Sequence, residues 1–161
     1  QRLEDLHPHR TEAGFSNLCG QLAETGAILR GEGRFQFFAQ GEGPLFLDSE
    51  LLFQVFENLL SNAGRYAQQM VWARAELSEG SLSLTVSDDG PGFPPEALKR
   101  AAEPYYRGEK YAPERENHFG LGLYLCRVLC EKPGGRLEIS NHPQGGAQVT
   151  ARFNVGPPQE T

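Results

Sequence analysis

Residues 51–66, LLFQVFENLLSNAGRY, are the stretch from which we interpret the rest of the chain. Apolar residues recur there every three or four positions, which predicts one amphipathic helix with a broad apolar face. Asp48, just before this stretch, is a candidate N-cap residue. Asn58 and Asn62 lie one helical turn apart and Arg65 follows about a turn later, so they form a polar stripe beside the apolar face. Taken alone, this stripe is either a solvated helix edge or one wall of a binding site.

The composition is that of a single domain. The chain has 161 residues, enough for one hydrophobic core, and its 19 Gly and 11 Pro predict prominent loops. A formal net charge of −6 argues against nucleic acid as a partner. No apolar run reaches the ~20 residues of a membrane-spanning helix and no signal peptide is recognisable, so we expect no membrane contact by this fragment. Because the chain starts at Gln1, we expect a piece of a longer protein whose other parts can carry a membrane anchor.

The predicted elements are helices interspersed with pairs of short strands. Alternating apolar residues separated by turn signals predict antiparallel hairpins rather than a strictly parallel sheet. This order predicts an α+β fold, a two-layer α/β sandwich whose mixed, mostly antiparallel sheet is covered on one face by about three helices. The expected helices are 17–30, 51–66, 95–102 and 120–131, and the expected strands are 35–37, 45–47, 71–77, 82–86, 137–139 and 147–153.

Polar or Pro-rich sequence flanks this region on both sides. We expect residues 1–15 to be an irregular linker remnant, residues 16–155 to be the domain, and residues 156–161 to be a flexible tail, with fraying beginning after Phe153.

The three cysteines, Cys19, Cys126 and Cys130, form no CxxC pair. The last two are one helical turn apart, which places both on one helix face rather than in disulfide geometry. We therefore expect reduced thiols in the core.

A first glycine-rich segment, Asp88–Phe93 (DDGPGF), follows the strand predicted over 82–86. A carboxylate at a strand end can present an acceptor oxygen, while Gly90 and Gly92 let bare backbone come close to a ligand. The exocyclic amine of adenine is a donor and suits such an acceptor. The alternative is a tight turn with a solvated Asp88.

A second glycine-rich segment, residues 118–123 (HFGLGL), opens the helix predicted over 120–131. Glycines at a helix N-terminus let unpaired amides converge on phosphate oxygens. The segment is not a dinucleotide fingerprint, because Leu125 stands where the third glycine belongs and no strand precedes it. The chain also contains no Gly-Lys-[Ser/Thr] and none of the His-Arg-Asp or Asp-Phe-Gly signatures of protein kinases.

Taken together, these motifs resemble a known family. Asn58-x-x-x-Asn62, Asp88-x-Gly90-x-Gly92 and Gly120-Leu121-Gly122-Leu123 are similar in order and spacing to the N, G1 and G2 boxes of bacterial sensor histidine kinases, which belong to the GHKL ATPase superfamily. Residues 103–107, EPYYR, resemble the F box that lies between G1 and G2. The resemblance covers about residues 16–155 and implies a domain that binds ATP and Mg²⁺.

The resemblance implies a role for each matching residue near the metal and the base. Asn62 would coordinate Mg²⁺ with the help of Asn58, and few protein ligands are expected because Mg²⁺ keeps several waters. Asp88 would accept a hydrogen bond from the adenine amino group. Arg65 and Tyr66 stand where the family has a basic residue and an aromatic residue facing the phosphates and the base.

The remaining matching residues would act on the phosphates. Residues 103–119 would form the ATP lid, and residues 120–123 (Gly120, Leu121, Gly122 and Leu123) would let the lid and the helix start close on the phosphates. Arg107 would either steady phosphate charge or pair with carboxylates of the lid.

The residue at position 58 separates the branches of the superfamily. Gyrase-type and chaperone ATPases carry a Glu there as a general base, whereas an amide cannot take a proton at neutral pH. Glu57 lies ~100° further around the helix and should not substitute. The resemblance therefore implies transfer of the γ-phosphoryl group to a histidine on a separate dimerisation domain, because no such acceptor is recognisable here, for relay to the receiver domain of a response regulator. It also implies a cytoplasmic domain of a membrane-bound bacterial sensor kinase.

Two other activities remain open on the same fold. One is an anti-sigma-factor-type serine kinase, and the other is a pseudokinase that senses nucleotide and regulates a partner without phosphoryl transfer. An ATPase of DNA topology or of the chaperone type is disfavoured by Asn58.

Overall fold

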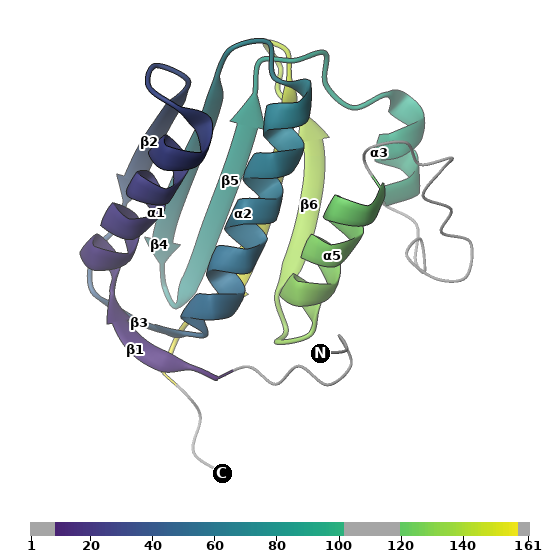
Figure 1. The fold of residues 1–161 in the computed structure, drawn as a ribbon. Helices are drawn as coiled ribbons and strands as arrows, with labels where there is room; N and C mark the ends of the chain where they lie inside the picture. The colour runs from purple at the N-terminus through teal and green to yellow at the C-terminus, as the bar shows by residue number, and fades with distance from the viewer. Residues whose placement is uncertain (1–8, 102–119, 158–161) are drawn as a thin grey trace.

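The computed structural model describes residues 9–101 and 120–157. Its main sheet has five strands in the order β2-β4-β5-β7-β6, and a separate two-stranded sheet pairs β1 with β3. Three long helices, α1, α2 and α5, lie on one face of the main sheet, and α3 lies beside β6 (Figure 1). The strands are β1 Thr11–Gly14, β2 Phe35–Gln40, β3 Pro44–Leu47, β4 Val71–Ser78, β5 Ser81–Asp88, β6 Arg136–Asn141 and β7 Ala147–Asn154, and the helices are α1 Phe15–Arg30, α2 Ser49–Tyr66, α3 Pro95–Ala101 and α5 Gly120–Glu131.

The pairing of the main sheet confirms the predicted fold class. β2 pairs with β4 in parallel, while β4, β5, β7 and β6 pair antiparallel with their neighbours. On β5 the side chains of Leu82, Leu84, Val86 and Asp88 are buried and alternate with half-exposed ones. This period of two gives the sheet one face for the helix layer and one for solvent. Asp88 therefore ends a strand on the same face as the core residues before it.

Helix α2 forms over the predicted stretch for the predicted reason. Asp48 is its N-cap, with an extended backbone and a side-chain Oδ1 that accepts from Leu51 N at 3.1 Å. The apolar face, which includes the fully buried Val55 and Phe56, packs into the core. The helix ends at Tyr66, after which the amide of Ala67 still donates to Ala63 O at 2.8 Å. The polar stripe thus lies in the last two turns of a well-anchored helix.

The three cysteines are free and buried, as expected. Burial raises the pKa of Cys19 to about 11 and, with Glu131 adding to it, that of Cys130 to about 12. Cys126 Sγ lies 3.7 Å from Val55 O and joins α5 to α2. These thiols are therefore packing residues of the core.

Both ends of the domain are more ordered than the sequence predicts. Within the region expected to be an irregular linker, residues 11–14 form β1, whose partner is β3. The expectation of fraying after Phe153 is also wrong, because Val155 is buried and its backbone bonds both Phe46 and Gly80 at 2.8 Å. Arg10 reaches the carbonyl of Gly156 at 2.5 Å. The boundaries 16–155 remain a prediction, but ordered chain extends from before Arg10 to Gly156.

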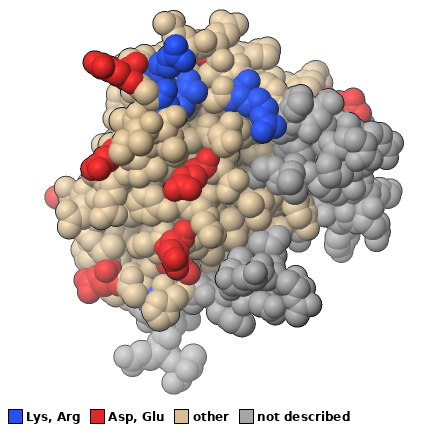
Figure 2. All heavy atoms as spheres, in the orientation of Figure 1, with Lys and Arg blue, Asp and Glu red and all other residues tan. Residues whose placement is uncertain are grey.

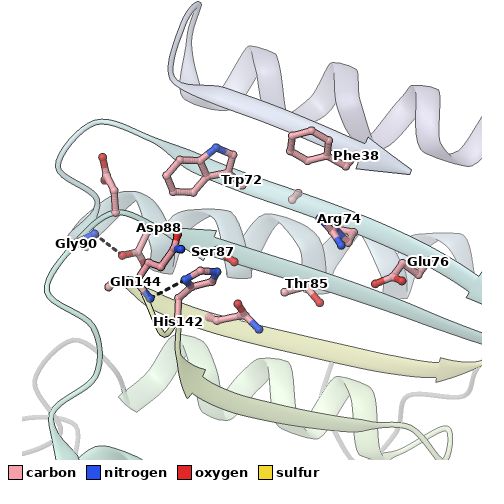
Figure 3. A pocket seen from close by; sticks show the side chains of 14 residues that line it. Phe38, Trp72, Arg74, Glu76, Thr85, Ser87, Asp88, Gly90, His142 and Gln144 are labelled. Atoms are coloured by element: carbon pink, nitrogen blue, oxygen red, sulfur yellow. Dashed lines mark hydrogen bonds between the residues drawn. The ribbon is translucent and has the colours of Figure 1, made fainter. Parts of the chain in front are cut away.

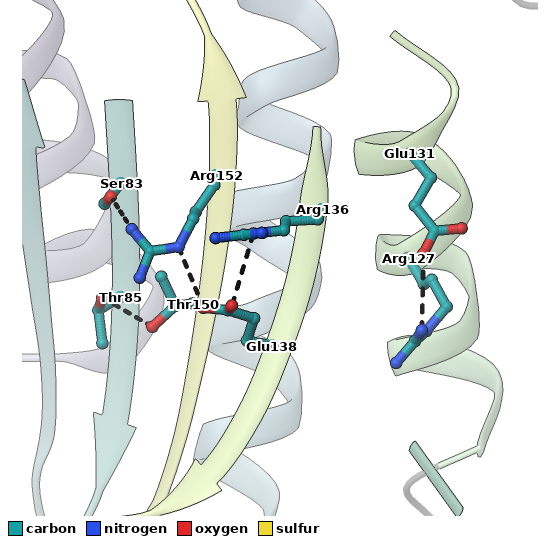
Figure 4. A network of polar contacts seen from close by, with 8 residues as sticks. All are labelled: Ser83, Thr85, Arg127, Glu131, Arg136, Glu138, Thr150 and Arg152. Carbon is teal, nitrogen blue, oxygen red and sulfur yellow. Dashed lines mark hydrogen bonds and ion pairs between the residues drawn. The ribbon is translucent and has the colours of Figure 1, made fainter. Parts of the chain in front are cut away.

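The outer face of the sheet carries a polar network, and no helix of the described residues covers it (Figure 1). Arg152 donates from Nε to Glu138 Oε1 at 3.0 Å and from a terminal nitrogen to Ser83 Oγ at 2.8 Å (Figure 4). Such exposed pairs contribute little to stability, typically about 0.2–1 kcal/mol each. In the part of the chain that the structure describes, no helix is long and apolar enough to cross a membrane.

Candidate functional site

The three motif regions come together at one end of the molecule. The C-terminal end of α2, the end of β5, the start of α5 and the turn between β6 and β7 all lie at the upper end of the sheet in Figure 1. This follows from the topology, because α2 and β5 run toward that end and α5 runs away from it. The polar stripe of α2 therefore neighbours the first glycine-rich segment, as the sequence predicts.

The polar stripe has a buried member, a half-buried one and an exposed one. Asn62 is only 7% exposed, Asn58 is half-buried and Arg65 is exposed. Asn58 donates from Nδ2 to Gln54 O at 2.8 Å, which leaves its amide oxygen available. The side chain of Asn62 makes no hydrogen bond with another residue of the described ranges. Buried amides normally have partners, and the amide of Asn62 is therefore open to a water or a ligand.

Asp88 is the second buried polar residue of this end. It is 3% exposed, and its Oδ1 accepts from Gly90 N at 2.8 Å and from Ala147 N at 3.5 Å (Figure 3). Its Oδ2 receives no hydrogen bond from the residues that the structure describes. Burial raises the pKa of Asp88 above 3.8, the two backbone donors oppose that shift, and the charge of Asp89 adds to it. A desolvated carboxylate oxygen thus remains ready for one more donor.

The glycines of this segment are required by close packing against the protein itself. A side chain at Gly90 would run into the carbonyl oxygen of Tyr66, so the segment lies directly against the end of α2. Gly92 has φ +85° and a Cβ there would lie 2.8 Å from Asn141 Oδ1. These glycines thus admit a close approach of Tyr66 and Asn141, and their expected approach to a ligand stays a prediction.

Two residues that the sequence analysis did not single out hold this segment. The carboxylate of Asp89 accepts from the amides of Gln68, Gln69 and Met70 at 2.8–3.1 Å. The amide of Asn141 accepts from Phe93 N at 2.7 Å and donates to Phe93 O at 2.9 Å. In the sequence, Asp89 followed by glycine indicates only a turn. The clamp at Asn141 joins residues 48 positions apart and leaves no local signal.

Tyr66 and Leu123 lie at the border of this site. Tyr66 is half-buried, and burial raises the pKa of its phenol against the opposing charge of Arg65. Leu123, in the first turn of α5, is half-buried and packs against the core. Leu121 lies in the same helix, which begins at Gly120 as predicted. Arg107, the expected F box 103–107 and the expected lid 103–119 lie outside the described residues, as do the surroundings of Gly120, Leu121 and Gly122.

Positive charge gathers at the same end of the molecule. Arg30 and Arg65 are the basic residues of the last turns of α1 and α2. Figure 2 shows Lys and Arg side chains at the upper end of the helix-covered face, and Asp and Glu side chains both beside them and spread below them. Such an arrangement favours an anion at this end. Among the residues that the structure describes, no three His, Cys, Asp or Glu side chains are grouped to hold a metal ion.

A hollow lies on the opposite face of the sheet. It has a volume of about 770 Å³, and its walls include Phe38, Trp72, Arg74 and His142 (Figure 3). It meets the site described above only at the strand end, near Asp88. We place the candidate site on the helix side, because the buried side chains of Asn62 and Asp88 belong to that layer.

The chain matches a known family over most of its length. Residues 47–157 match the family described as histidine kinase-, DNA gyrase B- and HSP90-like ATPase. The C4-dicarboxylate transport sensor protein DctB of Pseudomonas aeruginosa is 37% identical over 124 residues, which cover 73% of this chain and 20% of that protein. The sensor histidine kinase GtrS of the same species is 29% identical over 151 residues, covering 92% of this chain and 30% of that protein. The chain thus spans less than a third of these relatives.

Solved structures show the same fold. The catalytic domain of the histidine kinase ThkA has a TM-score of 0.72 at 21% identity, covering 93% of this chain and 99% of that chain. Full-length ShkA in complex with AMPPNP has a TM-score of 0.73 at 21% identity, covering 99% of this chain and 34% of that chain.

A helix-covered sheet with a buried carboxylate and a buried amide at one end defines a two-layer domain whose candidate site lies at that end. The match over residues 47–157 shows the family: the chain belongs to the histidine kinase-, DNA gyrase B- and HSP90-like ATPase family. Within that family it is an ATPase domain of the histidine kinase type.

Proposed function

We propose that this domain binds Mg-ATP and transfers the γ-phosphoryl group to a histidine on a separate dimerisation domain. The proposal rests on two buried polar side chains, Asp88 and Asn62, which lie at the same end of the sheet. Each has hydrogen-bonding atoms that no described residue uses. An adenine amine fits the first and an oxygen-preferring cation fits the second. The family match and the nucleotide in the ShkA structure support the same assignment.

The base would lie against Asp88. Oδ1 is already used by Gly90 and Ala147, so Oδ2 is the atom left to accept from the adenine amino group. Gly90 keeps Asp88 next to the end of α2, where Tyr66 is half-buried and offers an aromatic edge. The adenine would therefore lie beside the end of β5, against Asp88 and close to Tyr66.

The metal and the phosphates would lie along the polar stripe of α2. Mg²⁺ when bound neutralises phosphate charge. Asn62 offers a buried amide oxygen and Asn58 a half-buried one, whose Nδ2 is already fixed by Gln54. The exposed Arg65 adds positive charge toward the phosphates.

The local chemistry of α2 favours transfer over hydrolysis. Asn58 cannot take a proton from water, and Glu57 is exposed on a different side of the helix. The domain would then contribute positioning and electrostatics, while the attacking atom is an imidazole nitrogen of the partner domain. We propose that the parent is a membrane-bound sensor kinase with this domain in the cytoplasm, and that a response regulator receives the phosphoryl group. The names of the relatives, which are sensor proteins, support this.

Incubation of the chain with γ-labelled ATP, Mg²⁺ and the separate dimerisation domain of a relative tests the proposal. We expect label on that domain that is lost in acid and kept in base, as a phosphoramidate requires. Acid-stable label would support a serine kinase instead. ATP binding without transfer would support a nucleotide-sensing pseudokinase, and rapid release of phosphate by the chain alone would support a hydrolase of the gyrase or chaperone type.

The raised pKa of Asp88 predicts opposite effects of acid on binding and on stability. Because the folded pKa lies above the unfolded value of 3.8, protonation favours the folded chain, so this group's contribution to stability rises as the pH falls through the folded pKa. The adenine contact needs the ionised form and should weaken in the same range. Calorimetric titration with Mg-ATP and chemical unfolding between neutral pH and pH ~4, each compared with Asp88→Asn, measure the two trends. Parallel pH trends of wild type and Asp88→Asn would contradict the assignment.

A further inference from the structure

The segment that presents Asp88 is tied to the rest of the domain from two sides. On one side, the carboxylate of Asp89 accepts hydrogen bonds from the backbone amides of Gln68, Gln69 and Met70. These three residues follow shortly after the end of α2. The backbone of Asp89 also donates to Met70 O at 3.2 Å. Asp89 thereby fixes the end of β5 relative to the end of α2, which carries Arg65 and Tyr66.

On the other side, Asn141 holds the far end of the same segment. Its amide makes a two-way contact with the backbone of Phe93, at 2.7 Å to the amide nitrogen and 2.9 Å to the carbonyl oxygen. It also closes the space over Gly92. Phe93 is itself buried, so the segment ends in an apolar anchor. Ala147, the first residue of β7 after the turn that follows Asn141, donates its amide to Asp88.

We propose that Asp89 and Asn141 are positioning residues that hold the Asp88–Phe93 segment in its nucleotide-binding geometry before the nucleotide arrives. The inference rests on the proposed function, because it assigns these two residues a role in the same site. Neither side chain has to touch the nucleotide. A glycine-rich segment can adopt many backbone conformations. The contacts of Asp89 and Asn141 restrict them before the nucleotide binds, which lowers the conformational entropy lost on binding.

Alanine variants at the two positions, with a matched control, test the inference. Asp48→Ala is the control, because Asp48 caps the opposite end of α2 and lies outside the site. We expect Asp89→Ala, which loses three backbone contacts, and Asn141→Ala, which loses two, each to lower the affinity for Mg-ATP by about tenfold in calorimetry. Asp48→Ala should lower the unfolding midpoint while changing the affinity less than about twofold.

Conservative variants separate positioning from general destabilisation. Asp89→Asn keeps one acceptor oxygen, and Asn141→Asp keeps the acceptor for Phe93 N but loses the donor to Phe93 O. Asp89→Asn should therefore bind more tightly than Asp89→Ala, and it remains informative where the alanine variant does not fold. Asn141→Asp sets two acceptors against each other at Phe93 O and should bind no more tightly than Asn141→Ala. Amide hydrogen exchange without nucleotide should quicken at Gln68–Met70 in the Asp89 variants and at Phe93 in the Asn141 variants.

Affinities of the Asp89 and Asn141 variants within about twofold of wild type, or losses that simply follow the fall in unfolding midpoint as in Asp48→Ala, would overturn the inference. So would unchanged exchange at Gln68–Met70 and Phe93. Failure of the proposed function gives a different result, since wild type and Asp48→Ala would then bind no Mg-ATP, and the positioning role would fall with it.

Discussion

Replacing Asp88 by Asn is expected to lower the affinity for Mg-ATP by about 100-fold, because a hydrogen bond to a charged acceptor contributes about 1.5–3 kcal/mol and ~1.4 kcal/mol is a factor of ten. The amide oxygen of the variant would have to face the amides of Gly90 and Ala147, which donate to Oδ1 in the wild type. Its NH₂ group would then face the adenine amine, and two donors would oppose each other in a buried place.

Calorimetric titration of wild type and Asp88→Asn with Mg-ATP measures this loss. Asp48→Asn is the matched control, because it makes the same chemical change at a carboxylate that caps α2 away from the site. We expect the control to bind within about twofold of wild type. Equal affinities of Asp88→Asn and wild type for Mg-ATP would exclude Asp88 as the acceptor for the adenine amino group.

Replacing Asn62 by Ala is expected to lower Mg-ATP affinity and phosphoryl transfer by tenfold or more and to change ATP binding in EDTA by less than about twofold. The asymmetry arises because the buried amide oxygen would serve the metal, whereas the base and ribose would lie elsewhere. The free energy of unfolding without ligand should stay the same or rise. Ala is the better helix residue, and the variant removes a buried amide that has no hydrogen-bond partner among the described residues.

Titrations with and without Mg²⁺, together with chemical unfolding, measure both effects. Ser61→Ala is the control, since Ser61 is the exposed neighbour on the same helix turn. Loss of equal size in Mg²⁺ and in EDTA would exclude Asn62 as the metal-binding residue and would indicate a role in the shape of the nucleotide site.

The sequence predicts the elements that have a strong period or a motif. Helix α2 follows from apolar residues at helical spacing with Asp48 before them, and the β4–β5 hairpin follows from alternation broken at Glu79-Gly80. The polar stripe and the first glycine-rich segment single out Asn62 and Asp88, and both are buried at the same end of the sheet. Local residue patterns were sufficient for these predictions because each pattern lies within one element.

What the sequence does not reveal depends on contacts between distant segments. β1, with the sequence TEAG, has no apolar period, and it is a strand because β3 offers it a partner. The parallel pairing of β2 with β4 is likewise a tertiary contact, because β3 and α2 lie between these two strands in the sequence. Asn141 looks like an ordinary turn residue until Phe93 is brought to it from 48 positions away. Arg107 and the expected lid stay predictions.

The burial of all three cysteines has a practical consequence. Because the pKa of Cys19 is raised to about 11 and that of Cys130 to about 12, few thiolates are present at neutral pH, and the thiolate is the form that reacts with maleimides and iodoacetamides. Cys126 is buried as well. The native thiols of the folded chain should therefore react little with labelling reagents. A single Glu57→Cys variant would place one dye beside the polar stripe of α2 without removal of the native cysteines.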